Sequence, residues 1–253
     1  MAGTWSMPRG SGDRWPLDYE RGRPGWPAAV LDIAGVPPDA TVLDLGAGTG
    51  KLTRLLVARF RRVVAVEPSD EMRRLLVELC PQAEALAGTG QAIPLDDASV
   101  EAVFAAQAFH WFRDGVDEVA RVLRPGGAFV ATFNVPAEPW QPSTADAERL
   151  LAERIAEGEL GYDPLDLGSP HADDLRESFA GTPFEELRET TFVNPQTLDP
   201  DGLVAYYASM GWLAELPDDE RLPLLREVAS RLQRETHTRV WQTRIYWTRR
   251  LRG

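Results

Sequence analysis

The chain of 253 residues has little cysteine and no long apolar run. Its single cysteine, Cys80, excludes an internal disulfide and a metal site built from several cysteines. No stretch approaches the roughly 20 apolar residues that a membrane-spanning helix needs. Residues 1–9 also lack the apolar core of a secretory signal. These absences predict a protein of the reducing cytoplasm with no membrane partner.

Positive charge is scarce as well. The formal net charge is −12, and Lys51 is the only lysine. A negative field disfavours a long contact with a phosphate backbone, so we expect no nucleic-acid partner. Five arginines do crowd the C-terminal end, and we interpret them as a solvated strand end. They are Arg239, Arg244, Arg249, Arg250 and Arg252.

The three histidines are His110, His171 and His237. None belongs to a His, Cys and Asp cluster at metal-ligand spacing, so no metal is predicted. We expect His171 and His237 to lie on the surface. His110 is the only histidine close to the chemistry inferred below.

Apolar residues make up 43% of the chain and charged residues 26%, as in a globular protein. Apolar segments typical of buried strands alternate with helical patterns over residues 41–134, and this order predicts an α/β fold with a doubly wound parallel sheet. The expected strands are 41–45, 63–67, 83–87, 100–106 and 128–133, with a turn at 125–127. The expected helices are 27–34, 52–60, 116–123 and one that starts at Ser69 as N-cap and ends before Pro81.

Four segments follow from this pattern. Residues 1–26 are expected to be an N-terminal segment or lid, loosely ordered over 1–12, and residues 27–134 the nucleotide-binding core. Residues 135–183 carry helical patterns at 145–156 and 171–179 and are interpreted as an insertion or cap. Residues 184–253 supply strands at 184–193 and 238–247 and pocket helices at 203–213 and 222–232.

A glycine turn follows the first strand of the core. Gly46, Gly48 and Gly50 stand at alternate positions, which is not the dinucleotide spacing G-x-G-x-x-G. A phosphate-binding P-loop is also excluded, because Leu45 and Leu52 stand where that motif needs Gly and Ser or Thr. Asp44 would repel a pyrophosphate but attract an ammonium or sulfonium group. The turn therefore favours a site for S-adenosylmethionine.

Glu67 ends the second strand of the core. An acid at this place can accept hydrogen bonds from both hydroxyls of a ribose, as in dinucleotide-binding folds. The alternative is a surface carboxylate.

These segments resemble a known family. Residues 42–50 (VLDLGAGTG), 64–69 (VAVEPS), 88–95 (GTGQAIPL) and 121–127 (RVLRPGG) are similar to four motifs of the class I S-adenosylmethionine-dependent methyltransferases. Residues 19–27 and 106–112 resemble a small-molecule subgroup (methyltransferase type 11) that includes trans-aconitate methyltransferase-like proteins. The resemblance implies a Rossmann-like, mostly parallel seven-stranded sheet with an antiparallel last strand and a helical cap.

The resemblance also implies roles for single residues. Asp44, Gly46 and Gly48 would face the methionine part of the cofactor and Glu67 the ribose. Thr89, Gln91 and Ala92 would edge the adenine, although Thr89 and Gln91 stand where many relatives carry an acid. Gln107 would lie beside the cofactor at the end of the fourth strand, and Tyr19 and Arg23 would close over it. The complete expected set is Tyr19, Arg23, Asp44, Gly46, Ala47, Gly48, Glu67, Pro68, Thr89, Gln91, Ala92 and Gln107.

The acceptor side is less well marked. His110 can serve as a general base, since its ordinary pKa lies near working pH, or as a packing residue beside Phe109 and Trp111. Aromatic side chains suit a sulfonium and an apolar substrate, but they suit a core equally well. The expected pocket residues are His110, Trp111, Trp140, Tyr206, Tyr207 and Trp212.

The function expected from these features is methyl transfer from S-adenosylmethionine to an oxygen or nitrogen of a small molecule, with S-adenosylhomocysteine as product. Two alternatives stay open. A nicotinamide-dependent oxidoreductase is disfavoured by the glycine spacing and by the lack of a Tyr-x-x-x-Lys pair. A non-catalytic cofactor-binding homologue has no sequence feature against it. Neither the acceptor nor the oligomeric state follows from the sequence.

Overall fold

The computed structural model describes residues 14–137, 144–157, 172–232 and 236–252 of the chain. The chain divides into two compact units, and neither is continuous in sequence. Unit 1 comprises Met1–Pro24, Pro136–Leu167 and Pro195–Trp241, and unit 2 comprises Gly25–Val135, Gly168–Asn194 and Gln242–Gly253. The segment 135–183, expected to be one insertion, therefore contributes residues to both units.

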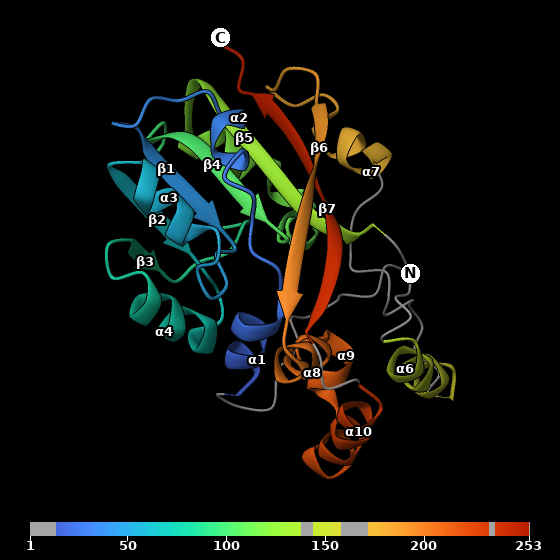
Figure 1. Cartoon of the computed structure of the whole chain (residues 1–253). Coiled ribbons are helices and arrows are strands. Elements are labelled where there is room, and N and C mark those ends of the chain that lie inside the picture. The colour runs from blue at the N-terminus through green and yellow to red at the C-terminus, as the bar shows by residue number, and fades with distance from the viewer. Residues whose placement is uncertain (1–13, 138–143, 158–171, 233–235, 253) are drawn as a thin grey trace. The chain divides into compact units, whose positions relative to one another are not determined.

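Unit 2 is built on a seven-stranded sheet of order β3-β2-β1-β4-β5-β7-β6 (Figure 1). The strands are β1 (Thr41–Leu45), β2 (Arg62–Val66), β3 (Glu84–Leu86), β4 (Val100–Ala106), β5 (Leu123–Pro136), β6 (Arg188–Leu198) and β7 (His237–Arg249). The pairs β1–β2, β1–β4, β2–β3 and β4–β5 are parallel.

The last strand in sequence runs against its neighbours. Near the start of β5, Gly126 donates its N–H to Arg250 O at 2.9 Å, and near its end Asn134 Oδ1 accepts from Thr243 at 2.5 Å. Residue numbers rise along β5 while those of its partner β7 fall, so the pair is antiparallel. The expected mostly parallel sheet of seven strands with an antiparallel last strand is confirmed.

Both faces of this sheet are covered, because successive side chains of a strand point to opposite faces. Leu43 and Leu45 of β1 belong to one apolar cluster with α5 and α7, and Val42 belongs to another with α2 and α3. The helices of unit 2 are α2 (Val30–Ile33), α3 (Thr53–Arg59), α4 (Asp70–Leu79), α5 (Val116–Val122) and α7 (Ala172–Phe179). Strands alternating with helices on both faces make the doubly wound fold that the sequence predicts.

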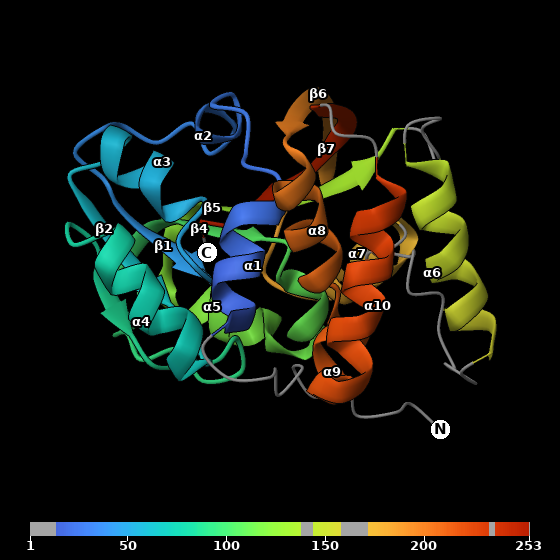
Figure 2. The same ribbon diagram turned by 60° about the horizontal axis from the view of Figure 1, so that its bottom comes forward.

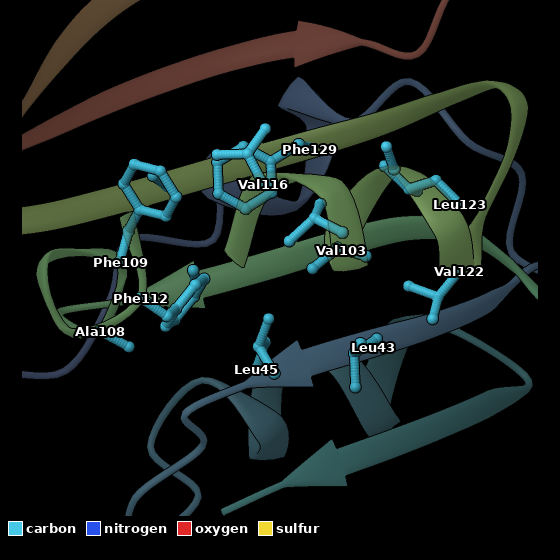
Figure 3. Packing of buried hydrophobic residues seen from close by; sticks show 14 of the residues in the cluster. Leu43, Leu45, Val103, Ala108, Phe109, Phe112, Val116, Val122, Leu123 and Phe129 are labelled. Atoms are coloured by element: carbon cyan, nitrogen blue, oxygen red, sulfur yellow. The ribbon is translucent and has the colours of Figure 1, made fainter. Parts of the chain in front are cut away.

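The first of these clusters extends to the loop after β4. Figure 3 shows Phe109 and Phe112 of that loop beside Phe129 of β5 and Leu45 of β1. Phe109 packs with its ring centroid 5.3 Å from Phe112 and 5.2 Å from Phe129. The loop is therefore fastened to the sheet by aromatic packing, which fixes the place of its other residues.

Unit 1 is helical. It contains α1 (Arg14–Gly22), α6 (Ala145–Glu157), α8 (Pro200–Ala208), α9 (Gly211–Glu215) and α10 (Asp218–Arg231). Helix α8 packs against both α1 and α10, and α10 also packs against α6 (Figure 2). The contact of α1 with α8 is so close that a Cβ on Gly22 would overlap the backbone of Tyr206.

Most predicted elements are confirmed, including Ser69 as the N-cap of α4, whose hydroxyl accepts the N–H of Met72 at 3.2 Å. The prediction for residues 1–12 lies outside the described residues. Within the expected N-terminal segment or lid, residues 14–22 form helix α1, which was not among the expected helices. This short polar helix depends on a contact with a distant part of the sequence, which a local pattern does not reveal. The indole N–H of Trp15 donates to Ser209 O at 3.3 Å.

Four further predictions are corrected. His237, expected on the surface, is 2% exposed, and Arg239, expected at a solvated strand end, is 7% exposed. Both lie on the buried face of β7, because alternate residues of a strand point to the same side.

The expected helix 203–213 breaks at Ser209, because Ser209 O accepts from Trp15 and Arg23 and Met210 is extended. The expected turn at Pro125–Gly127 lies inside β5, where Gly126 has a φ of +82° and the register with β4 shifts. A bulge in a long strand replaces the turn.

Candidate functional site

The loop after β1 turns on three glycines with left-handed backbone. The φ angles of Gly46, Gly48 and Gly50 are +73°, +58° and +86°, and this region favours glycine. A Cβ on Gly46 would lie 2.6 Å from Cβ of Ala108, and one on Gly50 would lie 2.6 Å from a methyl of Leu76. A Cβ on Gly48 would meet nothing within 4 Å. Gly46 and Gly50 are therefore required by packing, whereas Gly48 borders open space.

Asp44 lies fully buried near the end of β1. Its Oδ2 accepts from Thr53 Oγ1 at 2.7 Å, while Oδ1 has no hydrogen-bond partner. Burial, with Glu67 nearby as a further negative group, raises the pKa of Asp44 to about 7. A buried acceptor oxygen without a partner is costly, so Oδ1 can bind a cationic or donor group with gain.

Glu67 follows β2 directly and is also fully buried. Its two carboxylate oxygens accept from backbone N–H groups: Oε2 from Gly48 at 2.7 Å and Oε1 from Ser69 at 2.9 Å. Burial raises its pKa, against the effect of these two bonds and of Arg73. Each oxygen keeps capacity for a further donor, so two hydroxyl groups can be held here.

The segment after β3 brings three more expected residues to this edge of the sheet. Thr89 and Ala92 exchange backbone hydrogen bonds of 3.3 and 3.2 Å and form a tight, exposed turn. The side chain of Gln91 donates to Trp111 O at 3.2 Å and to Asp114 Oδ1 at 2.9 Å. The amide of Gln91 therefore joins this turn to the loop after β4, and its expected place at the edge of an adenine stays a prediction.

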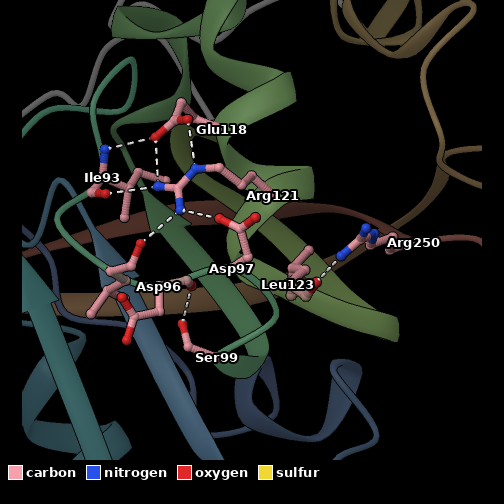
Figure 4. Close-up of polar contacts among 9 residues, drawn as sticks. Ile93, Asp96, Asp97, Ser99, Glu118, Arg121, Leu123 and Arg250 are labelled. Carbon is pink, nitrogen blue, oxygen red and sulfur yellow. Dashed lines mark hydrogen bonds and ion pairs between the residues drawn. The ribbon is translucent and has the colours of Figure 1, made fainter.

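The side chain of Arg121 on α5 forms hydrogen bonds to the same segment. Its guanidinium donates to Ile93 O, Leu95 O, Asp97 and Glu118 at 2.7–2.9 Å (Figure 4). Glu118 Oε2 accepts the N–H of Ile93 at 3.0 Å. Sequence reasoning missed these two residues. The signal was present, because Arg121 opens the motif at residues 121–127.

Gln107 directly follows β4. Its φ of +53° is unusual for a residue with a side chain. Its N–H donates to Thr132 O at 2.8 Å, and its Oε1 accepts the N–H of Asn134 at 3.1 Å. Strained backbone of this kind gathers at functional sites, and here neighbouring strand β5 holds it.

His110 and Trp111 lie just beyond Gln107, with ring centroids 4.5 Å apart. His110 Nδ1 is buried without a hydrogen-bond partner. Burial, with a smaller effect of Arg113, lowers the pKa of His110 to about 4. The imidazole is therefore neutral at pH 7 and a weak base.

The remaining expected residues belong to unit 1 or fall outside the described residues. Trp140 is not described. Tyr206 and Tyr207 are each 1% exposed in the core of unit 1. Trp212 is buried there too, with its indole N–H unpartnered. Their expected contact with an acceptor stays a prediction.

Tyr19 and Arg23 stand close together in unit 1. The Arg23 guanidinium lies 5.6 Å from the Tyr19 ring and 5.4 Å from the Tyr206 ring, and its Nε donates to Ser209 Oγ at 2.8 Å. This arrangement orders the arginine within unit 1. Closure of these residues over a cofactor stays a prediction.

Ten of the twelve expected cofactor residues thus belong to unit 2, and the other two, Tyr19 and Arg23, belong to unit 1. In the described part of the chain, no group of three or more His, Cys, Asp or Glu side chains is placed to hold a metal ion. None of the described helices has the length and apolar character to span a membrane.

Comparison with known sequences and structures gives one answer. A family model described as "Methyltransferase domain" matches residues 43–131. An uncharacterized methyltransferase of Mycobacterium tuberculosis is 44% identical over 184 residues, which cover 71% of this chain and 70% of that protein. A trans-aconitate 2-methyltransferase of Azoarcus is 34% identical over 213 residues, covering 74% of this chain and 76% of that protein.

Solved structures share the fold. A structure from Anaeromyxobacter dehalogenans assigned as a type II methyltransferase aligns with a TM-score of 0.66 at 24% identity, covering 91% of this chain and 99% of that one. A phosphoethanolamine N-methyltransferase of Haemonchus contortus, solved with S-adenosylhomocysteine, aligns with a TM-score of 0.57 at 15% identity. The alignment covers 95% of this chain and 58% of that one.

Proposed function

The chain belongs to the methyltransferase family, and from this premise we propose that it transfers a methyl group from S-adenosylmethionine to a small-molecule acceptor. One observation carries the proposal. Two buried carboxylates, Asp44 and Glu67, end adjacent parallel strands against a left-handed glycine loop, and neither is paired with a side-chain cation by a hydrogen bond in the described part of the chain.

The residues present fit this cofactor. The unpartnered Oδ1 of Asp44 is the acceptor that an ammonium group needs. Glu67 has both oxygens available for ribose hydroxyls, and the open side of Gly48 leaves room that any Cβ would reduce. A pyrophosphate would instead meet two buried acids, which disfavours a nicotinamide dinucleotide.

S-adenosylmethionine supplies a methyl group already activated on a sulfonium. The protein then has to bind, orient and exclude water, and orientation alone accounts for a large share of such rate enhancements. Asp44 holds the cationic part, Glu67 fixes the ribose, and the turn at Thr89–Ala92 edges the adenine. The acceptor heteroatom would bond to the methyl carbon as the bond from that carbon to sulfur breaks, so that S-adenosylhomocysteine would leave and a protonated acceptor would lose its proton.

The need for a base depends on the acceptor. A carboxylate acceptor is already deprotonated at pH 7 and needs none, and the similarity to a trans-aconitate 2-methyltransferase supports acceptors of this kind. A hydroxyl acceptor would require a base. His110 lies in the loop after β4 but, with a pKa of about 4, would take a proton only weakly.

Calorimetric titration with S-adenosylmethionine and S-adenosylhomocysteine tests the proposal. We expect micromolar binding of both and no binding of NADH. Turnover is then tested with radiolabelled methyl donor against a panel of carboxylate, hydroxyl and amine acceptors. Binding of NADH without S-adenosylmethionine would reject the proposal, and binding without turnover on any acceptor would favour a non-catalytic homologue.

A further inference from the structure

Two loops of unit 2 that carry expected site residues contact each other directly. The 88–97 loop follows β3 and contains the turn expected to edge the adenine. The 107–115 loop follows β4 and carries His110 and Trp111 on the acceptor side. The two loops contact each other at three points, and the far end of the first is anchored.

The anchor is the Arg121 and Glu118 pair on α5. Together they bond to both backbone groups of Ile93, to Leu95 O and to the Asp97 side chain (Figure 4). The pKa of Glu118 is lowered chiefly by its bonds to Arg121. Residues 93–97 are thereby held to the helix, so a displacement at Thr89–Ala92 is not absorbed by this part of the loop.

Close packing at two glycines, Gly90 and Gly115, forms two of the three contacts between the loops. A Cβ on Gly90 would overlap the ring of Phe112, and a Cβ on Gly115 would overlap the carbonyl of Gly90. Phe112 itself is 3% exposed and packs on Phe109. The 88–97 loop thus lies directly on a residue that belongs to the apolar core.

The third contact is the Gln91 amide. It donates to Trp111 O at 3.2 Å and to Asp114 Oδ1 at 2.9 Å. Gln91 therefore reaches across to both ends of the short segment that follows His110. Gln91 lies within the Thr89–Ala92 turn, directly before Ala92, so its position depends on that turn.

We propose that Gln91 and Asp114 form a positioning pair that transmits cofactor occupancy at the Thr89–Ala92 turn to the 107–115 loop, and so orders His110 and Trp111 for the acceptor. This inference rests on the proposed function. A ligand that fixes the turn also fixes Gln91, and through it the segment Trp111–Asp114. Coupling of this kind is reciprocal, so an ordered 107–115 loop also favours cofactor binding.

Hydrogen exchange measured by mass spectrometry, with and without S-adenosylhomocysteine, tests the pair. The loop contains amides that report its order, since Trp111, Phe112 and Gly115 donate to backbone carbonyls within it at 2.8–3.1 Å. In the wild type we expect S-adenosylhomocysteine to slow exchange in both loops. In D114A the 88–97 loop should still be protected, while the protection gained by the 107–115 loop falls by about threefold to tenfold, as loss of one hydrogen bond implies.

Matched variants separate positioning from general loosening. D114N keeps an acceptor oxygen for Gln91 and should behave as the wild type. Q91A removes both hydrogen bonds of the amide and should lose at least as much protection in the 107–115 loop as D114A. The double variant should match Q91A, because D114A removes a bond that Q91A has already removed. A variant that merely weakens the fold would speed exchange throughout the chain, with and without S-adenosylhomocysteine.

The outcomes are distinct. Wild-type protection of both loops in D114A and Q91A would overturn the inference while leaving the proposed function standing. Absence of S-adenosylhomocysteine binding to the wild type would overturn both. Equal loss in D114A and D114N would also overturn the inference, because the hydrogen bond would then not carry the coupling.

Discussion

Both units contain buried carboxylates, but the groups that bond to these carboxylates differ between the units. In unit 1, Glu148 is 5% exposed and accepts from Arg239 at 2.9 Å and from Tyr207 at 3.0 Å. In unit 2, Asp44 and Glu67 are bonded only by a hydroxyl and by backbone N–H groups. A buried carboxylate that is hydrogen-bonded to a cation of its own unit serves the fold, and a buried carboxylate without a hydrogen-bonded side-chain cation is typical of a binding site.

Aromatic residues show the same contrast. In unit 1, Tyr206 lies between two guanidinium groups, 4.9 Å from that of Arg239 and 5.4 Å from that of Arg23. Of these two cations, Arg239 is buried and Arg23 is half-buried. In unit 2, the rings of His110 and Trp111 lie in a partly exposed loop. The comparison agrees with the proposal that the buried carboxylates of unit 2 bind a ligand, whereas Glu148 and Arg239 pair within unit 1.

The largest expected effect concerns the stability that the buried ion pair gives to unit 1. R239M removes the partner of Glu148 and leaves a carboxylate buried in unit 1. We expect the free energy of unfolding to fall by about 3–5 kcal/mol, measured by urea denaturation. R231A removes an exposed ion pair with Glu227 and is the control, with an expected cost below about 1 kcal/mol. Unchanged stability of R239M would break the contrast between the units.

The next largest effect concerns ligand binding by the buried carboxylates of unit 2. E67A removes the acceptor for the ribose hydroxyls, and we expect the affinity for S-adenosylhomocysteine to fall by about 100-fold, or ~3 kcal/mol. E84A, which removes an exposed carboxylate of β3 paired with Arg62, should bind as the wild type. Calorimetry measures both. Equal affinity in E67A and E84A would remove Glu67 from the site.

The pH dependence of binding sharpens the role of Asp44. Its pKa of about 7 without ligand means that a cationic ligand must ionise it, so affinity should rise with pH up to about 7 and then level off. Below pH 7 the expected change approaches tenfold per pH unit, with one proton released on binding. Calorimetry in buffers of different ionisation enthalpy detects this proton, and D44N should abolish the release.

The same raised pKa makes a prediction for stability. Between pH 4 and 7 the folded state holds a proton on Asp44 that the unfolded state has lost, so the contribution of Asp44 to stability falls as pH rises through this range. D44N does not titrate. The melting temperature of D44N minus that of the wild type should therefore increase from pH 5 to pH 8. A difference that stays constant over this range would contradict the raised pKa of Asp44.

His110 gives the smallest expected effect. Since its pKa is about 4, kcat should show no inflection from His110 between pH 6 and 8. We expect H110Q to lower kcat by less than about 100-fold, the lower limit typical of general acid–base catalysis. The pH profile of kcat measures this once an acceptor is known. A bell-shaped profile that H110Q flattens would make His110 the base after all.

The sequence determined the sheet, because buried parallel strands are near-continuous apolar runs that local pattern reveals. It also singled out Asp44 and Glu67, since Asp44 lies in the apolar run before the glycine turn and Glu67 directly follows the next apolar run. It predicted the helix that starts at Ser69, because capping is a local interaction between residues three apart.

Only the tertiary structure decided the rest. Helix α1 is short and polar and depends on Trp15 and Gly22 meeting α8, nearly 200 residues along the chain. The break at Ser209 exists because its carbonyl accepts from the same distant segment. The pKa values of Asp44 and His110 are set by burial, and the Gln91 bridge joins two loops on different strands. Such contacts depend on where segments meet in space, which no local pattern of residues records.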